Sequence, residues 1–382
     1  MSSSGIVVAT DKWRGSWSSA EAGAAIGDGV RRARPEAVVE VVAVADGGEG
    51  TIDALLGPPR VSPPAGAARI GARVTGPSGA PVDAEWAQFD ADRGLIEIAR
   101  AAGHALLLPR ERDPLKTTTR GVGELVSTAL DRGCASLTLA LGGSATVDGG
   151  AGFAQALGFR LLDTRGREIA PGGGALLGLH AIEADHVDAR LGSVRFEAWC
   201  DVRNPLLGPN GAARVFAPQK GADAVAVEQL ERGLEVLARV IERDLGKRVA
   251  DLESGGAAGG LGAAAAAFVN AALEPGAERV LKAVDFDSRL DRAALVITGE
   301  GRFDGASMPG KLVSAVADRA AARGIPVVLI CGRDARVDPS DRGSFAAVLS
   351  GEELVRSGGE LLSREDLSRL GARAVEHARL VR

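Results

Sequence analysis

The sequence is poor in the side chains that form most disulfide, zinc and nucleophile sites. It has three cysteines, Cys134, Cys200 and Cys331. They are far apart and form no C-x-x-C pair, so we expect reduced and buried thiols. It has four histidines, His104, His180, His186 and His377, and none of them has metal-ligand spacing. We therefore expect no zinc site and no histidine-based triad, and a carboxylate is the expected base for any proton abstraction.

Long apolar runs and basic runs are missing as well. The longest apolar run, 261–273, is too short and too rich in alanine to span a bilayer, and the N-terminus lacks the features of a signal peptide. The net charge is −5 and the isoelectric point is about 5.6, which argues against nucleic acid or a membrane as a partner. These absences predict a cytoplasmic protein.

What the chain has in abundance is glycine, 52 of its 382 residues, set among alternating strand and helix patterns. The alternation is regular at both ends and irregular in the middle, which favours two α/β domains. We predict a Rossmann-like parallel sheet formed from both chain ends, 1–66 and 286–382. A second, mixed α/β domain, 67–285, is inserted between them.

One glycine pair follows a strand pattern in TLALGGSATVDGG, 138–150. Gly142 and Gly143 could aim N–H groups and the start of the next helix at an anion. An ordinary turn into a helix needs the same glycines, and the stretch matches neither G-x-G-x-x-G nor G-x-S-x-G. Both interpretations stay open. The glycine-rich segment 255–268 is likewise either a ligand loop or the start of an alanine-rich packed helix.

Lys311 ends a near match to the P-loop, GASMPGKL, 305–312. Leu312 stands where a hydroxyl for Mg²⁺ is needed, and the preceding strand is predicted to end at about Thr298, so we do not expect a true P-loop. Lys311 at a helix start could still meet a phosphate as a point charge. The alternative is a solvated surface lysine.

Acidic residues follow several predicted strands in glycine-rich turns. They are Asp46, Glu49, Asp201, Glu300 and Asp304. The carboxyl ends of parallel strands converge on a ligand crevice, where carboxylates suit Mg²⁺ or a general base. The alternative for each of them is a cap on its own turn.

Eight motifs together resemble those of the bacterial glycerate kinase family that uses ATP, the type-one glycerate 2-kinases. They occur in the family's order over about 300 residues: TDKWRGSWSSAEA, VADGGEGTIDAL, VTGPSGAPVDAEW, DPLKTTTRGVGEL, LGGSATVDGGAGFAQALG, CDVRNPLLGPNGAARVFAPQKGA, GAAGGLGAAAAAF and ALVITGEGRFDGASMPGK. The resemblance implies two α/β domains with the active site in the cleft between them. It also implies transfer of the γ-phosphoryl group of ATP to D-glycerate with Mg²⁺, giving 2-phosphoglycerate.

Residues inside these motifs are the site candidates. The predicted catalytic residues are Asp201, Asp304 and Lys311. The predicted metal ligands are Asp46, Glu49 and Asp148. The predicted binding residues for substrate or phosphate are Asp11, Lys12, Arg14, Ser16, Thr117, Thr118, Gly142, Gly143 and Ser144. The expected partners are ATP and D-glycerate, and the expected oligomeric state is a monomer or homodimer.

Several positions depart from the family pattern. Arg14 stands where a second lysine is usual, so its anion contact would be a fork and not a point. Val147 stands where asparagine is frequent, which removes a polar group beside the loop. Two other functions stay open: a nicotinamide-dependent oxidoreductase of a small hydroxy acid, and a non-enzymatic sugar-acid sensor. The first is disfavoured because no G-x-G-x-x-G follows the first strand.

Overall fold

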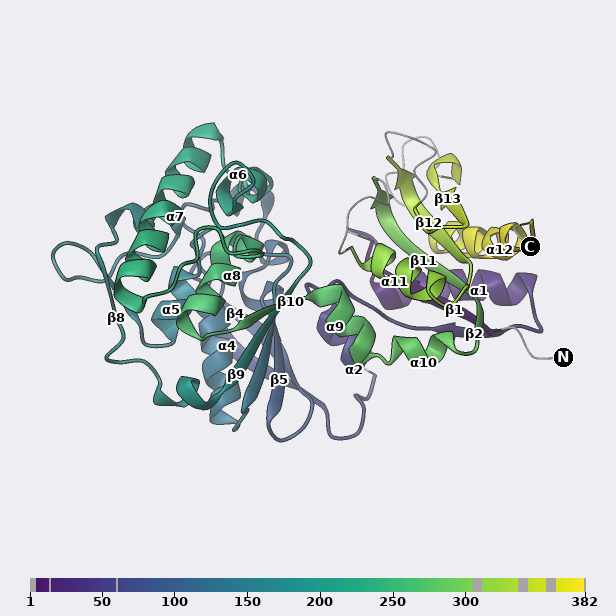
Figure 1. Ribbon diagram of the computed structural model, residues 1–382, viewed down its shortest axis with the longest axis horizontal. Helices are drawn as coiled ribbons and strands as arrows, with labels where there is room; N and C mark the ends of the chain where they lie inside the picture. The colour runs from purple at the N-terminus through teal and green to yellow at the C-terminus, as the bar shows by residue number, and fades with distance from the viewer. Residues whose placement is uncertain are drawn as a thin grey trace. The chain divides into compact units, whose positions relative to one another are not determined.

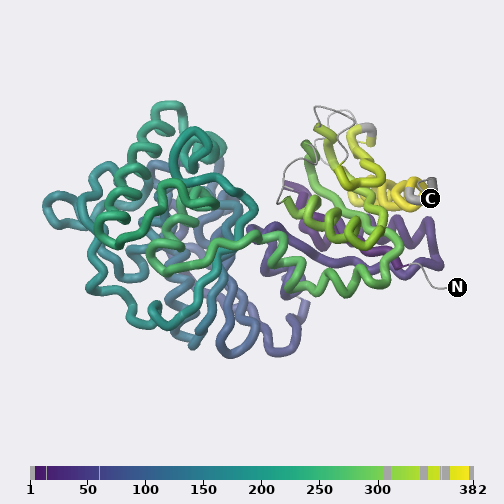
Figure 2. Tube along the Cα trace, viewed as in Figure 1, coloured from purple at the N-terminus to yellow at the C-terminus, as the bar shows by residue number. Residues whose placement is uncertain are grey.

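The structure is a computed structural model that describes residues 5–13, 15–59, 61–304, 311–335, 343–354 and 362–380. The chain forms two compact units (Figure 1). Unit 1 comprises Met1–Asp46, Asp53–Val61 and Gly276–Arg382, and unit 2 comprises Gly47–Ile52 and Ser62–Pro275. Figure 2 shows the purple N-terminal segment and the green to yellow C-terminal segments within the same unit.

Unit 1 is built on a parallel sheet of order β13-β12-β11-β1-β2. Its strands are β1 (Gly5–Thr10), β2 (Val38–Val41), β11 (Ala293–Phe303), β12 (Val327–Asp334) and β13 (Ala347–Ser350). Its helices are α1 (Ser19–Ala33), α9 (Gly276–Ala283), α10 (Phe286–Leu290), α11 (Leu312–Ala321) and α12 (Arg364–Leu380), with a 3₁₀ turn η6 at Glu352–Leu354. The Rossmann-like sheet from both chain ends is thereby confirmed.

Helices cover both faces of this sheet because apolar residues alternate along the strands. Val7 and Val296 pack with residues of α9, α10 and α11, whereas the adjacent Val8 and Ile297 pack with α1 and α12. The strand order reverses between β1 and β11, since β2 follows β1 on one side and β11 returns on the other. That is the position where doubly wound sheets open a ligand crevice.

Local signals fix α1 more firmly than they fix the strand ends. A capping box begins the helix, because the Ser18 side chain accepts from the Glu21 N–H and the Glu21 carboxylate accepts from the Ser18 N–H. β2 is short and ends at Val41. The predicted end of a strand at Thr298 is wrong, because β11 continues to Phe303 while it pairs with β12.

Unit 2 contains a mixed sheet of order β10-β9-β6-β5-β4-β3. Its strands are β3 (Ala68–Thr75), β4 (Pro81–Gln88), β5 (Arg93–Glu97), β6 (Ser136–Ala140), β9 (Arg195–Cys200) and β10 (Ala272–Pro275). β3, β4 and β5 are antiparallel neighbours, and the remaining pairs are parallel. β4 and β5 thus form a hairpin. A short antiparallel pair, β7 (Arg160–Leu162) and β8 (Ala181–Glu183), lies apart from this sheet.

The helices of unit 2 bury one large core that contains residues of the sheet and of α4, α7 and α8. They are α3 (Ala99–Ala102), α4 (Arg120–Asp131), α5 (Ala151–Ala156), α6 (Ala212–Phe216), α7 (Ala224–Leu245) and α8 (Ala257–Phe268). Short 3₁₀ turns are η1 (His104–Leu106), η2 (Pro109–Glu111), η3 (Gly173–Gly178), η4 (Ala189–Ser193) and η5 (Pro218–Lys220). The mixed α/β fold of the inserted part is confirmed.

Helix α2 (Thr51–Leu56) begins in unit 2 and ends in unit 1. Its first turn is held by Glu97, a fully buried residue whose carboxylate accepts from the Ile52 N–H at 2.6 Å. An acidic group at a helix start is favourable because it satisfies an N–H that has no partner inside the helix.

Two expectations about composition can be checked directly. The thiols of Cys134, Cys200 and Cys331 form no disulfide with one another and are buried, as predicted. Among the described residues, no helix is both long enough and apolar enough to cross a bilayer.

Candidate functional site

The first candidate region lies where β1 and β11 end in unit 1. The backbone N–H of Asp11 donates to the Gly299 carbonyl at 2.8 Å, so Asp11 sits at the reversal of strand order. Lys12 Nζ lies 3.2 Å from Asp46 Oδ1. Ser16 Oγ donates to the Trp13 carbonyl at 3.0 Å, which uses its hydroxyl inside its own turn. Arg14 lies outside the described residues.

Glu300 and Lys311 belong to the same region. Burial raises the pKa of Glu300 to about 7; the Lys311 ammonium opposes this shift, and the Asp11 and Asp304 carboxylates add to it. Among the described residues Glu300 Oε1 has no hydrogen-bond partner. Lys311 Nζ lies 2.6 Å from Asp304 Oδ1, at the start of α11. The structure therefore brings Asp11, Asp304 and Lys311 around a carboxylate that sequence reasoning noted but did not select.

The glycine loop of unit 2, Gly142–Ser144, follows β6. A Cβ at Gly142 would lie 2.6 Å from Gly48 Cα, so only glycine fits there. Gly143 has φ +68° and is exposed. Within the described residues, the N–H groups of Gly143 and Ser144 find no acceptor. Successive free N–H groups beside a left-handed glycine form a concavity that suits an anion.

Asp148, on the far side of this loop, is fully buried. Its carboxylate accepts from Thr119 N at 2.8 Å, Thr119 Oγ1 at 2.9 Å, Gly150 N at 3.1 Å and Gly152 N at 3.2 Å. Burial raises its pKa, and these hydrogen bonds act in the opposite direction. Its oxygens thus bind the protein itself. Because Asp148 is also fully buried, a metal ion could reach these oxygens only by entering the core.

The two predicted threonines have a similar position. Thr117 Oγ1 donates to the Ala145 carbonyl at 3.0 Å, and Thr118 Oγ1 accepts from Arg120 N at 3.2 Å. Both side chains are buried. The Thr117 bond holds the segment before α4 against the loop, the Thr118 bond holds the start of α4, and neither hydroxyl is exposed in this structure.

Lys220 was not predicted, and it is the most unusual residue of the unit. It is 3% exposed, and its Nζ lies 2.7 Å from both Ser144 Oγ and the Thr146 carbonyl oxygen. Burial lowers its pKa to about 7, with the Asp148 carboxylate opposing the shift. The sequence signal was its place in the APQKGA part of a family motif. Nothing in the local pattern indicated burial.

Asp201 and Glu49 flank the glycine loop. Asp201 follows β9, the neighbour of β6, and the N–H of Leu141 donates to the Trp199 carbonyl at 2.9 Å. Asp201 and Gly142 therefore lie at adjacent strand ends. The Glu49 carboxylate is close to Gly143, since a Cβ there would lie 3.2 Å from Glu49 Oε2. The Asn204 side chain donates to the Asn210 carbonyl at 2.8 Å and closes the turn after Asp201.

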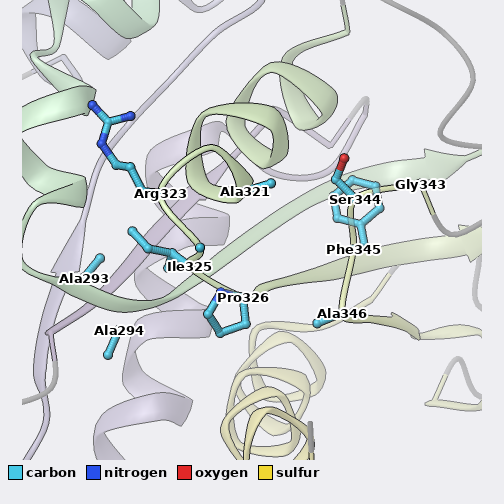
Figure 3. A pocket seen from close by; sticks show the side chains of 11 residues that line it. Ala293, Ala294, Ala321, Arg323, Ile325, Pro326, Gly343, Ser344, Phe345 and Ala346 are labelled. Carbon is cyan, nitrogen blue, oxygen red and sulfur yellow. The ribbon is translucent and has the colours of Figure 1, made fainter. Parts of the chain in front are cut away.

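A cavity of about 700 Å³ lies at the amino ends of strands in the unit 1 sheet, opposite their carboxyl ends (Figure 3). Its lining includes Ala294 at the start of β11, Pro326 just before β12 and Ala346 just before β13. The side chain of Arg323 extends away from Ser344 and Phe345 in Figure 3. Because the ligand crevice of a doubly wound sheet lies at the carboxyl ends of its strands, this cavity is not part of the candidate site.

A doubly wound sheet with acidic and basic groups at its switch point is typical of α/β enzymes. The glycine loop of the other unit has a geometry that suits an anion. The sequence matches the glycerate kinase family over residues 6–372. The chain belongs to the glycerate kinase family, and it is therefore a phosphotransferase.

Individual relatives agree with this placement. The chain is similar to a glycerate kinase of Bacillus subtilis, with 45% identity over 87% of this chain and 85% of that protein. It is 44% identical to a glycerate 2-kinase of Escherichia coli, over 86% of this chain and 84% of the relative. A crystal structure from Salmonella typhimurium, of a protein assigned as glycerate kinase 2, superposes with a TM-score of 0.80 at 39% identity. That match covers 99% of this chain and 98% of the other.

Proposed function

We propose that this protein transfers the γ-phosphoryl group of ATP to the 2-hydroxyl of D-glycerate, giving 2-phosphoglycerate. In that reaction the acceptor oxygen forms a bond to Pγ, the bond between Pγ and the β,γ-bridging oxygen breaks, and the hydroxyl proton leaves. The observation that carries the proposal, beside family membership, is the glycine loop, where Gly143 is exposed and, among the described residues, the N–H groups of Gly143 and Ser144 have no acceptor. Both substrates carry anionic oxygens that such a loop binds.

The residues at the strand ends supply what phosphoryl transfer requires, which is positioning and charge. We assign the Lys12 and Lys311 ammonium groups to phosphate oxygens, with Asp46 and Asp304 as the carboxylates beside them. We assign Asp11, at the end of β1, to the same substrate site. We assign Asp201, which lies at the strand end beside the glycine loop, to orient the acceptor hydroxyl and to take its proton. The hydroxyls of Thr117, Thr118 and Ser16 bond to protein groups, which supports a role in stabilising the site and not in direct contact with the substrates.

Mg²⁺ fits the residues present in a limited way. The described residues contain no group of three or more histidine, cysteine or acidic side chains that could hold a metal. Kinases usually bind Mg²⁺ through one or two carboxylates together with the substrate phosphates. This chain can supply the carboxylates. Asp46 and the exposed Glu49 are the carboxylates that would hold it, whereas we propose that Asp148 fixes the loop instead. When bound, Mg²⁺ neutralises phosphate charge.

The test is a turnover assay with D-glycerate, ATP and Mg²⁺, with the product identified by phosphorus NMR. A 2-phosphate ester together with ADP is the expected result. Matched reactions contain L-glycerate, or GTP in place of ATP. A 3-phosphate product would overturn the position of transfer alone. NAD⁺-dependent oxidation of glycerate without ATP consumption would favour the oxidoreductase alternative, and tight glycerate binding without turnover would favour the sensor.

Cytoplasmic location and a monomeric or homodimeric state are further parts of this proposal. Cell fractionation and light scattering test them independently of the chemistry.

A further inference from the structure

Lys220 is held in place by the backbone on both sides. It ends η5, and Gly221 follows with φ +100°. A Cβ at Gly221 would lie 2.5 Å from the Arg112 carbonyl oxygen, so only glycine allows the chain to turn there. The turn places the ammonium group under the loop, with 3% of the residue exposed. A lysine is buried in this way only at a considerable desolvation cost.

The contacts of Lys220 determine the direction of the Ser144 hydroxyl. When Lys220 is protonated, its ammonium group has three donors and no acceptor, so Ser144 Oγ accepts in the 2.7 Å contact with Nζ. The hydrogen of the Ser144 hydroxyl must then go elsewhere. No described residue accepts it, and the adjacent N–H groups of Gly143 and Ser144 have no acceptor either. Three donors therefore lie together on one short loop.

We propose that Lys220 is a positioning residue that turns the Ser144 hydroxyl into a donor for an anionic oxygen of the substrate bound on Gly143 and Ser144. The inference rests on the proposed function, because the anion is either the glycerate carboxylate or a phosphoryl oxygen of ATP. The lysine does not touch the substrate. It acts through Ser144 and through its charge beneath the loop.

A purely structural lysine would behave differently. Loss of Lys220 would then lower the stability of the fold and would weaken the binding of every ligand equally, whichever residue stands at position 144. If Lys220 acts through Ser144, the two substitutions share one effect, and the double variant loses hardly more than either single variant. Each single loss of a donor to a charged oxygen should weaken binding about 10- to 100-fold.

The experiment is a double-variant cycle with Lys220→Met, Ser144→Ala and the combined variant, and Lys247→Met as the control. Lys247 is an exposed lysine of the same unit whose Nζ contacts Asn270. Calorimetry measures the binding of D-glycerate, of a non-hydrolysable ATP analogue with Mg²⁺, and of inorganic phosphate. Thermal melting records folding. Lys220→Arg keeps the charge and is expected to recover part of the lost affinity.

The expected result is a 10- to 100-fold loss for one ligand in each single variant, similar in the double variant, with Lys247→Met unchanged. The ligand that loses affinity identifies the anion. Independent, multiplying losses would overturn the proposal, and so would an unchanged affinity in a folded Lys220→Met protein. Because binding is measured without turnover, failure of wild-type catalysis would count against the proposed function alone.

Discussion

Lys12 and Asp46 form an ion pair in unit 1, with 3.2 Å between Nζ and Oδ1 and side chains 20% and 30% exposed. The lysine follows β1 and the aspartate follows the segment after β2, so the pair lies at the carboxyl edge of the parallel sheet. A partly exposed pair of this kind contributes about 0–1 kcal/mol to folding. We therefore expect the pair to matter mainly because it fixes the position of the Lys12 charge.

Lys12→Met should consequently reduce catalysis far more than stability. Loss of one preorganised cation near the transferred group lowers kcat by roughly 10²–10³. The melting temperature should change little. Steady-state kinetics and a melting curve, with Lys247→Met run alongside, measure both. Full activity in the Lys12 variant would remove Lys12 from the phosphate site.

Asp201→Asn keeps the size of the side chain and still accepts a hydrogen bond in the turn after β9. If Asp201 orients the acceptor hydroxyl and takes its proton, kcat should fall by roughly 10²–10⁴ while the fold is kept. Single-turnover kinetics separate this from a loss of substrate binding. Near-normal turnover at an unchanged melting temperature would show that Asp201 only caps its turn.

Asp148→Ala tests whether Asp148 holds the loop or a metal. The four donors that its buried carboxylate accepts would be left without a partner, so the free energy of unfolding should fall by about 2–5 kcal/mol. Urea denaturation without Mg²⁺ measures this. Asp251→Ala, on an exposed side chain, is the control. Unchanged stability with a weakened Mg²⁺ affinity would instead support the metal role.

Glu300 makes stability depend on pH. Its pKa is about 7 in the folded protein against 4.5 for the free side chain, so the folded state holds the extra proton between those values and stability falls as pH rises through them. Glu300→Gln removes this loss. The free energy of unfolding of the variant should exceed that of the wild type by almost nothing at pH 4.5 and by about 3 kcal/mol above pH 8. The comparison uses denaturation at both pH values and Glu253→Gln as the exposed control. A pH-independent difference would contradict the assignment.

Local signals in the sequence predicted elements such as α1, where Ser18 and Glu21 form the capping box within four consecutive residues. The features that the sequence did not predict depend on contacts between residues that are far apart in the chain. β11 runs past Thr298 because β12 continues to pair with it, and no local pattern shows that. The residue types of the site could be predicted from motifs, but the side-chain directions could not. Asp148 and Thr117 were selected for their oxygens, yet packing turns those oxygens inward. Lys220 reaches Ser144 across 76 positions of sequence.

The chain passes between the two units after Asp46, Ile52, Val61 and Pro275, and this has a genetic consequence. A recombination event that exchanged 62–275 as one block would leave Gly48 and Ile52 behind in the recipient. The transferred Gly142 would then pack against a foreign segment at a tight contact, where a Cβ at position 142 would lie 2.6 Å from Gly48 Cα, and Glu97 would have to cap the start of a foreign helix. Unit 2 is therefore inherited intact only when two separate stretches of the gene travel together, so chimaeras within this family should be assembled with 47–52 and 62–275 from the same parent.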